Sequence, residues 1–405
     1  MNRILVGLLA IALLQRCISV PDAAERRVLG VGPVVKAQTR NLAPALARQI
    51  AAAKVGDEIR IKLLRGEVVT AITEGVDQEE GVTIWWGRIP SAKVYGGAVI
   101  VTLGARAIGL IQIDNVLRTL DTIERSGEPG DDTTLVTEIA QELFPQEESP
   151  ALRELGEMIE LEEAIDAIRA SVESPVTLSV LLVVPPALKD WCTPPGLWLL
   201  EAMSKASIDS VWAKFTGGAV VSRISTYCTS HVPGTDSLTE LDWVTADPDV
   251  KAQRTATKSN LVALFTTETK GCGISNGNTS VTNENAAARA FSVVRFDCAW
   301  DNYSLVHELG HSLAMNHDRF EQEGGDSTKC SYGFTILEDG KPAGRSVMAY
   351  SDYCKSINVD CPRYGVLSYG LTADGIQFGI PCGTTDAASN VDQLLVAAPV
   401  AAKWE

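Results

Sequence analysis

Residues 307–317 read HELGHSLAMNH and hold three of the four histidines in this 405-residue chain, His307, His311 and His317. His307 and His311 are four residues apart, so on a helix both project from one face, one turn apart, where they can bind the same ion. The leucines at the same spacing form an adjacent stripe that would anchor the helix in the core: Leu305, Leu309 and Leu313. The stretch therefore predicts a core-facing helix that carries a metal site.

The residue types at this site indicate zinc. Imidazole nitrogens suit Zn²⁺, and three of them fill three tetrahedral positions while the fourth stays open for water. Glu308 follows the first histidine, and its carboxylate would point at a water on the ion. This combination is typical of a hydrolytic zinc centre rather than a closed structural one.

The extended motif, with SVMAY at residues 346–350, resembles the metzincin metalloproteases, whose signature is HExxHxxGxxH followed by a methionine turn. The resemblance implies that His317 is the third zinc ligand, Glu308 the general base and Met348 the methionine beneath the metal. It implies a catalytic domain of α/β (α+β) class with a mixed twisted sheet and an active-site helix. It also implies hydrolysis of peptide bonds by a zinc-bound water that Glu308 activates.

Two details bear on the branch of the family. The string HELGHSLAMNHD, which ends at Asp318, is similar to the HELGHNLGMNHD of adamalysins and reprolysins. Met348 and Tyr350, by contrast, have the Met-x-Tyr spacing of astacins and serralysins, in which the tyrosine lies near the zinc. The chain is thus similar to bacterial-type, secreted reprolysin-like metzincins, and Tyr350 is a candidate donor to the tetrahedral oxyanion.

Ala314 occupies the position of the family's glycine, where the helix must end and the chain double back to deliver His317. If that backbone needs a positive φ, alanine costs about 1 kcal/mol or more relative to glycine. We expect three zinc ligands to hold such a turn, because structural zinc sites release on the order of 10 kcal/mol on binding.

The N-terminus and the cysteines indicate export. Residues 1–19 pair Arg3 with a short apolar run, as in a secretory signal peptide. The remaining cysteines form an even set that predicts up to four disulfides, although eight cysteines allow 105 pairings. They all lie after residue 190: Cys192, Cys228, Cys272, Cys298, Cys330, Cys354, Cys361 and Cys382. We therefore expect a secreted, extracellular protein.

Composition divides the rest of the chain into three parts. Residues 57–114 alternate apolar and polar positions between glycines, which predicts a mainly antiparallel β propeptide domain over residues 20–127. Residues 128–174 are acidic and predict a mostly helical connector, and residues 175–405 predict the catalytic domain, with an amphipathic helix over 198–215. The formal net charge of −16 argues against a nucleic-acid partner, and after signal removal we expect no membrane association.

The leading hypothesis is a secreted zinc endopeptidase made as a zymogen, with a protein or peptide substrate extended along the strand that leads to residues 271–274. Two alternatives stay open: a catalytically silent, zinc-stabilised secreted binding module, and a zinc amidase acting on cell-wall peptides. The propeptide, once Cys17 is removed, offers no thiol as a fourth zinc ligand. We therefore expect a carboxylate or a strand of the propeptide to cover the zinc and inhibit in cis. The loop over residues 351–370 would shape the substrate pocket.

Overall fold

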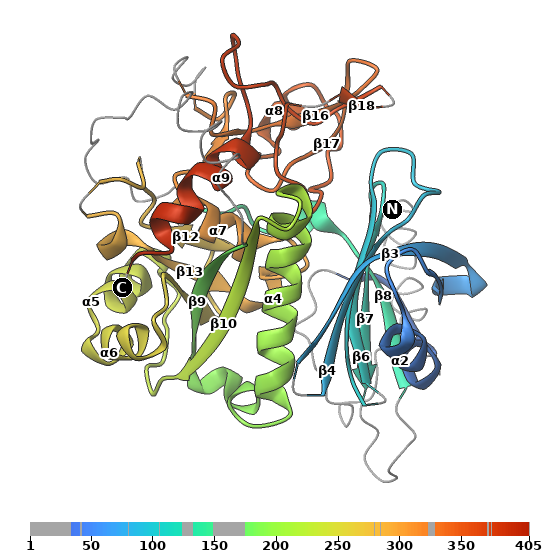
Figure 1. Cartoon of the computed structure of the whole chain (residues 1–405), viewed down its shortest axis with the longest axis horizontal. Coiled ribbons are helices and arrows are strands. Elements are labelled where there is room, and N and C mark those ends of the chain that lie inside the picture. Colours follow the sequence, from blue (N-terminus) through green and yellow to red (C-terminus); the bar gives the residue numbers. More distant parts are fainter. Residues whose placement is uncertain are drawn as a thin grey trace, which may run out of the picture.

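The computed structural model describes residues 34–40, 43–79, 81–104, 106–123, 133–148, 175–278, 280–283, 285–322, 329–370, 372–373 and 375–404. The expected signal peptide lies outside these ranges, as does the part of the expected connector over residues 149–174. Two sheets organise the described residues, one in each half of the chain (Figure 1).

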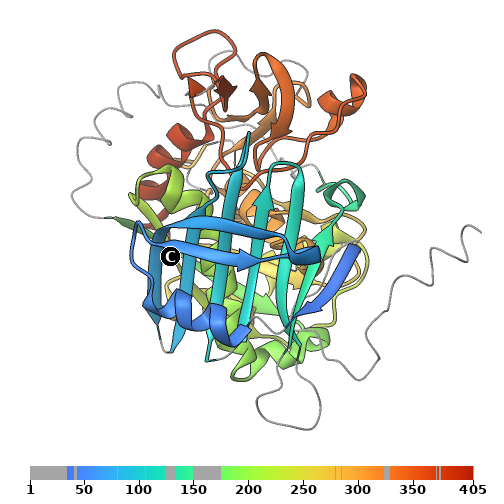
Figure 2. The same cartoon turned by 90° about the vertical axis from the view of Figure 1, so that its right-hand side faces the viewer.

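The first half forms an eight-stranded antiparallel sheet in the order β1-β8-β7-β6-β5-β4-β3-β2. Helix α2 (Ala43–Ala52) lies across one face of it (Figure 2), and Leu46 and Ile50 of this helix join the apolar side chains of that face. The strands are β1 (Val34–Arg40), β2 (Glu58–Lys62), β3 (Val68–Glu79), β4 (Val82–Arg88), β5 (Gly96–Leu103), β6 (Arg106–Ile113), β7 (Val116–Ile123) and β8 (Thr133–Ile139).

Strand β8 corrects the expected helical connector over residues 128–174. Residues 133–139 pair with β1 on one side and β7 on the other, so the β domain continues past residue 127. The sequence TTLVTEI is rich in β-formers, but it is short and lies within an acidic stretch whose average composition hides it. The next described residues form the 3₁₀ helix η2 (Gln141–Leu143).

The second half is built on a mixed five-stranded sheet in the order β10-β9-β11-β13-β12. Four strands are parallel and β12, at the edge, is antiparallel to its neighbour β13. The strands are β9 (Val176–Val184), β10 (Val220–Cys228), β11 (Leu261–Thr266), β12 (Gly273–Ser275) and β13 (Phe291–Arg295). The parallel strands are buried on both faces and read as continuous apolar runs. The expected α/β class is confirmed.

Helices cover both faces of this sheet. Helices α4 (Gly196–Phe215), α7 (Ser304–Ser312) and α9 (Asn390–Ala401) share one apolar core with it. Helices α5 (Ser237–Ala246) and α6 (Pro248–Thr257) pack on the opposite face. Helix α7, which carries the histidine motif, contacts β12 and β13 and so lies near the edge of the sheet.

Helix α4 lies between the two sheets (Figure 1). The sequence predicts an amphipathic helix there, but α4 buries polar residues such as Ser204 and Asp209 as well as its apolar ones, because both sheets contact it. Strand β10 of its own sheet supplies Ser222, whose amide donates to the Asp209 carboxylate over 2.8 Å, and strands β4 and β5 of the other sheet contact α4 as well. Lys205 on this helix also binds Asp77 of β3, with Nζ 2.8 Å from the carboxylate oxygen. One continuous core therefore joins the two halves.

The last part of the catalytic half consists of small sheets, a short helix and loops. Its elements are β14 (Asn316–Asp318), β15 (Tyr332–Gly333), β16 (Thr335–Glu338), β17 (Lys341–Arg345), α8 (Asp352–Ser356), β18 (Thr372–Ala373) and β19 (Ile376–Gln377). Short 3₁₀ helices lie elsewhere: η1 (Leu64–Gly66) in the first half, and η3 (Pro186–Cys192), η4 (Ala287–Arg289) and η5 (Phe296–Cys298) in the earlier part of the second. The expected disulfide framework is confirmed, with the pairs Cys192–Cys228, Cys272–Cys298, Cys330–Cys382 and Cys354–Cys361.

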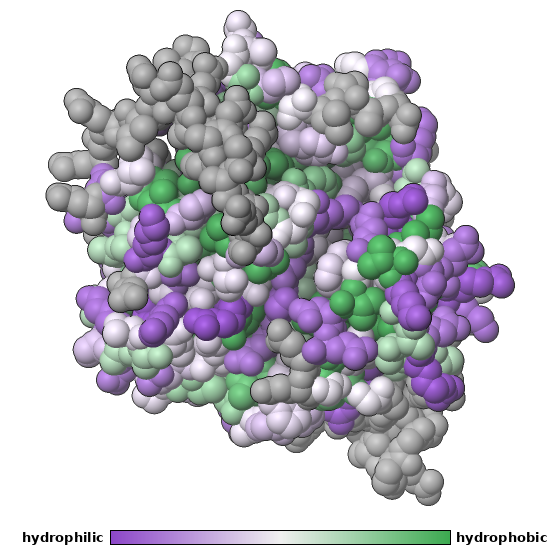
Figure 3. Space-filling view, viewed as in Figure 1, coloured by the Kyte–Doolittle hydropathy of each residue, from purple (hydrophilic) through white to green (hydrophobic). Residues whose placement is uncertain are grey.

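Among the residues described, no helix has the length and apolar character needed to cross a membrane. On the face drawn in Figure 3, polar side chains are spread over both halves of the molecule and apolar side chains are scattered between them. That face is thus mixed in character rather than divided into a polar and an apolar side.

Candidate active site

Helix α7 holds the first two histidines and ends immediately before the turn to the third. Its end is a Schellman motif, because the Met315 amide donates to the Gly310 carbonyl and the Ala314 amide donates to the His311 carbonyl. Ala314 has a φ of 61°, so the left-handed backbone that the sequence suggested is present. An alanine stands where glycine would be favoured, and the turn still forms.

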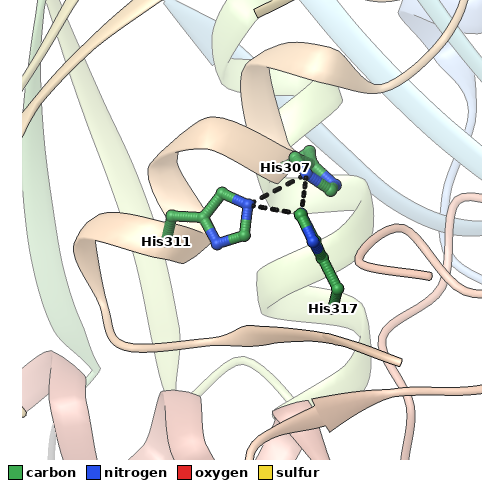
Figure 4. A group of neighbouring side chains, drawn as sticks. All are labelled: His307, His311 and His317. Carbon is green, nitrogen blue, oxygen red and sulfur yellow. Dashed lines mark hydrogen bonds between the residues drawn. The ribbon is translucent and has the colours of Figure 1, made fainter. Parts of the chain in front are cut away.

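The three histidines converge on one point. The Nε2 atoms of His307 and His311 are 3.0 Å apart, those of His311 and His317 are also 3.0 Å apart, and those of His307 and His317 are 3.3 Å apart. Figure 4 shows the first two rings projecting from α7 and the third reaching them from the returning chain. All three side chains are buried, and they are the group of potential metal ligands that stands out among the described residues.

Backbone carbonyls orient two of the three rings so that their Nε2 atoms could bind a metal. His307 Nδ1 lies 2.9 Å from the Val347 carbonyl and His311 Nδ1 lies 2.9 Å from the Met315 carbonyl. An Nδ1–H that donates to a carbonyl leaves the Nε2 lone pair free for an ion. Burial lowers the pKa of His311 to about 4 and the pKa values of His307 and His317 well below the ordinary value. All three rings are therefore neutral, as ligands must be.

Glu308 is fully buried beside the triangle. Neither of its carboxylate oxygens has a hydrogen-bond partner among the described residues, and burial, followed by the nearby Glu147 charge, raises its pKa well above the usual range. Gly273 makes room for it, because a Cβ at that position would lie 2.7 Å from Glu308 Cγ. A buried acceptor without a protein partner points to a water or substrate group as its partner.

Met348 lies beneath the histidine helix. It is fully buried, and a Cβ at Gly310 would lie 2.8 Å from its sulfur atom. The preceding residue, Val347, supplies the carbonyl that orients His307. The methionine turn therefore supports the triangle from below and aligns one of its ligands.

Tyr350 lies against the third histidine. Its ring centroid is 3.9 Å from that of His317, and its backbone amide donates to the Asp318 carboxylate over 2.8 Å. Its hydroxyl donates to the backbone carbonyl of Glu147, also over 2.8 Å. The tyrosine therefore lies beside the triangle and already binds a peptide carbonyl.

A segment of the first half, residues 146–148, runs along the edge strand of the second half. The Gln146 carbonyl accepts from the Cys272 amide over 3.1 Å, and the Glu148 amide donates to the Gly273 carbonyl over 2.8 Å. This is the strand edge that the sequence nominated for substrate. The sequence did not identify the segment itself, since nothing in QEE distinguishes it from the acidic residues around it.

The Glu147 side chain enters a buried pocket next to Tyr350. Its carboxylate pairs in bidentate fashion with the guanidinium of Arg363, and both side chains are 1% exposed. Burial alone would raise the pKa of Glu147, but the Arg363 charge and its hydrogen bonds outweigh this and hold that pKa well below its usual range. Arg363 lies in the loop over residues 351–370 that was expected to shape the pocket.

Comparison with known proteins shows a likeness to a family of metallopeptidases. Residues 214–359 match the model of metallo-peptidase family M12, described as Reprolysin_5. A peptidyl-Asp metalloendopeptidase of Xanthomonas campestris pv. campestris is 24% identical over 93% of this chain and 85% of its own length. A protein of the same name from Stenotrophomonas maltophilia is 23% identical over 84% of this chain and 81% of its own length.

This chain is similar to metzincin-type M12 metalloproteases. Among solved structures, metalloproteinase-II of Bacteroides fragilis is a distant neighbour, with a TM-score of 0.43 and 15% identity over 72% of this chain and 87% of its own. The expected metalloendopeptidase activity is supported by the family model that matches residues 214–359 and by the relatives.

Proposed function

We propose that this chain is a secreted, zinc-dependent endopeptidase that is made as a zymogen. The observation that carries the proposal is the convergence of three neutral imidazoles, with Nε2 atoms within 3.3 Å of one another. Beside them lies the Glu308 carboxylate, which has no hydrogen-bond partner in the described part of the chain. His307, His311 and His317 would hold the zinc. A trio of imidazoles fits this ion, because catalytic zinc sites combine three protein ligands with one open position.

Zinc, when bound, supplies Lewis-acid activation of water and of the scissile carbonyl. Glu308 acts as general base and then general acid: it takes a proton from the attacking water and passes it to the leaving amine. Its burial favours this exchange, since a carboxyl whose pKa is raised holds and releases a proton more readily near neutral pH.

Tyr350 is the proposed donor to the oxyanion. Its hydroxyl already donates to the Glu147 carbonyl, and burial raises its pKa above the ordinary value, so it stays protonated and able to donate. A donor that is held in place before reaction stabilises the charge that develops on a peptide oxygen without reorganising. Met348 and the Val347 carbonyl support the metal ligands and take no direct part.

The substrate is a polypeptide that binds in extended form along β12. The Cys272 amide and Gly273 carbonyl of this edge bind the chain's own residues 146–148, and an edge that pairs with one strand can pair with another. The relatives' name, peptidyl-Asp metalloendopeptidase, further favours cleavage next to acidic residues.

The N-terminal β domain is the proposed propeptide. It shares a core with helix α4, and its last described residues occupy the substrate edge and contact Tyr350. Inhibition in cis would follow directly, because a substrate cannot use this edge until the segment leaves. Four disulfides support an oxidising, extracellular destination.

The test is hydrolysis of a fluorogenic peptide library by the full chain before and after limited proteolysis. We expect one zinc per chain by elemental analysis, a rise in hydrolysis as the N-terminal domain is released, and loss of hydrolysis on chelation that zinc reverses. Zinc without hydrolysis under any condition would favour a silent binding module, and cleavage confined to peptidoglycan would favour an amidase. Full activity before proteolysis would contradict the zymogen.

A further inference from the structure

We infer that Arg363, together with Asn302 and Ser304, forms a specificity pocket for an acidic side chain of the substrate, and that Glu147 fills this pocket in the full chain as a substrate mimic. The inference rests on the proposed function, because it assigns a preference to that same site. It further names the residues that would bind the acidic side chain of the substrate, and Glu147 as the residue that would compete with that side chain for the pocket.

The pocket is built for a carboxylate. Glu147 Oε1 accepts from Arg363 Nη1, from Ser304 Oγ over 2.8 Å and from Asn302 Nδ2 over 3.2 Å, while Oε2 accepts from Arg363 Nη2 over 2.8 Å. Every one of these partners is a donor, and Ser304 is the first residue of helix α7, whose N-terminus favours negative charge. A planar guanidinium that binds both oxygens selects carboxylates by geometry as well as by charge.

The arginine is held by the catalytic half and not by the glutamate alone. The backbone of Arg345 fixes the residues on either side of Arg363. The Arg345 amide donates to the Pro362 carbonyl, and the Tyr364 amide donates to the Arg345 carbonyl. The Arg345 guanidinium donates to the Ala349 and Cys361 carbonyls, which ties this loop to the methionine turn. Arg363 Nη1 also donates to the Asn302 carbonyl over 3.0 Å. The cation therefore keeps its place when the segment leaves.

An empty pocket would leave a buried positive charge without its counter-ion. Arg363 is 1% exposed, and an unpaired buried charge is strongly unfavourable unless a new partner replaces the old one. A substrate carboxylate would restore the pair, whereas an amide or an apolar side chain would not. Acidic side chains should thus be preferred over their amides by a large factor.

The position of the pocket connects it to the reaction. Glu147, whose side chain fills the pocket, also accepts a hydrogen bond from the Tyr350 hydroxyl through its backbone carbonyl. Its neighbours, residues 146 and 148, pair with the β12 edge. A substrate on the same edge would place one of its own side chains in the same pocket, next to Glu308 and the histidines. The relatives' name, which specifies aspartate, agrees with a carboxylate at that place.

The test compares peptides that differ at one position, Glu or Asp against Gln or Asn, in the zinc-loaded full chain. The variant Glu147→Gln removes the occupant's charge, and we expect it to raise kcat/KM for acidic peptides at least about tenfold over the unsubstituted chain. Glu142→Gln is the matched control, because Glu142 is an exposed carboxylate in η2, just before residues 146–148, and the substitution should leave the rate unchanged.

The Glu147→Gln background then tests the arginine. In it, acidic peptides should exceed their amides by at least about tenfold in kcat/KM, and adding Arg363→Met should bring that ratio to about one while neutral peptides are still cleaved. Ser304→Ala should lower the ratio severalfold and serves as the milder variant if the double variant does not fold. The inference is overturned if Glu147→Gln shows no preference for acidic peptides over their amides, or if neither Arg363→Met nor Ser304→Ala lowers that preference. The Glu147–Arg363 ion pair would then be purely structural.

Direct binding separates this inference from the proposed function. Fluorescence anisotropy of a labelled acidic peptide is measured on Glu147→Gln/Glu308→Gln, with the amide peptide as competitor. Tighter binding of the acid that disappears with Arg363→Met supports the pocket even if no variant hydrolyses any peptide, a result that would refute the peptidase alone. Hydrolysis without any acid preference in rate or binding would refute the pocket and leave the peptidase.

Discussion

The histidine triangle and the Arg363 pocket lie next to each other but are assembled in different ways. The triangle comes from eleven consecutive residues, 307–317, and its orienting carbonyls belong to the catalytic half. The pocket pairs residues that are 216 positions apart and joins the two halves of the chain. The proposed metal site therefore lies wholly within the catalytic half, while the charge of Arg363 in the pocket is neutralised only when a carboxylate fills it.

This difference indicates where control over the enzyme lies. A site made by one helix and its turn forms as soon as that helix docks, and nothing in the N-terminal domain is needed to align its ligands. Arg363, by contrast, is a buried cation whose partner comes from outside the catalytic half. Its stability there depends on whether Glu147 or another carboxylate binds it. The following substitutions act on one region or the other and test whether the two are as separate as we describe.

Glu308→Gln should have the largest effect. We expect kcat to fall by about 10²- to 10⁴-fold, because the general base is lost while the metal ligands are untouched. Hydrolysis of a peptide substrate and zinc content are measured on the same preparation. Loss of zinc together with activity would show that Glu308 holds the metal site and that the triangle is not self-sufficient.

Arg363→Met should destabilise the full chain by about 3–5 kcal/mol, because it leaves the Glu147 carboxylate buried without its partner. The double substitution Glu147→Gln/Arg363→Met removes both charges and should recover most of that loss. Chemical denaturation followed by intrinsic fluorescence measures both. Equal destabilisation by the single and double variants would mean that the ion pair does not link the two halves.

The Glu147–Arg363 pair should also make the stability of the folded chain depend on pH, and the direction follows from the pKa of Glu147. The folded pKa of Glu147 lies below its ordinary value, so the stabilisation is present above the unfolded pKa of about 4.3 and is lost as pH falls toward the folded one. The Tm difference between the unsubstituted chain and the double variant should be constant from pH 8 to about 5 and shrink below that. A difference that grows on acidification would contradict the assigned direction.

Tyr350→Phe should lower kcat by about 10²-fold with little change in KM, since one donor to the oxyanion is removed. The ring, which packs on His317, is retained. A change confined to KM would show that the hydroxyl binds the substrate before reaction and does not stabilise the transition state. Tyr350 would then belong with the residues that bind substrate at the Arg363 pocket.

Ala314→Gly should have the smallest effect, a stabilisation of about 1 kcal/mol, because Ala314 has a φ of 61° that glycine adopts without strain. Thermal unfolding of the zinc-loaded chain measures it, with Ala286→Gly as the control at a buried alanine of ordinary φ, where glycine should destabilise. Destabilisation by both substitutions would mean that the turn to His317 is not strained.

The sequence predicted the parts of the site that depend on local geometry. Fourfold spacing placed His307 and His311 on one face of a helix, and the extended motif added His317, Glu308 and Met348, which the structure brings to the same place. It also nominated residues 271–274 as the edge for an extended chain, which residues 146–148 occupy in the structure. Each of these predictions concerns residues that lie close together in the sequence or that belong to a recognised motif.

The parts that escaped prediction depend on long-range packing. Glu147 looks like any other residue of an acidic stretch, and Arg363 like any loop cation, until the fold brings them together. Strand β8 was hidden by the acidic composition around it. Similarly, the burial of polar residues on α4 requires a second sheet that no helical periodicity reveals.

X-ray absorption at the zinc edge of the purified full chain shows whether the three histidines hold the metal. We predict one zinc per chain with three imidazole nitrogens at about 2.0–2.1 Å, falling to two in His317→Ala while the disulfide-bonded fold persists. A spectrum with sulfur ligands, a spectrum unchanged in His317→Ala, or a folded chain that takes up no zinc would contradict it.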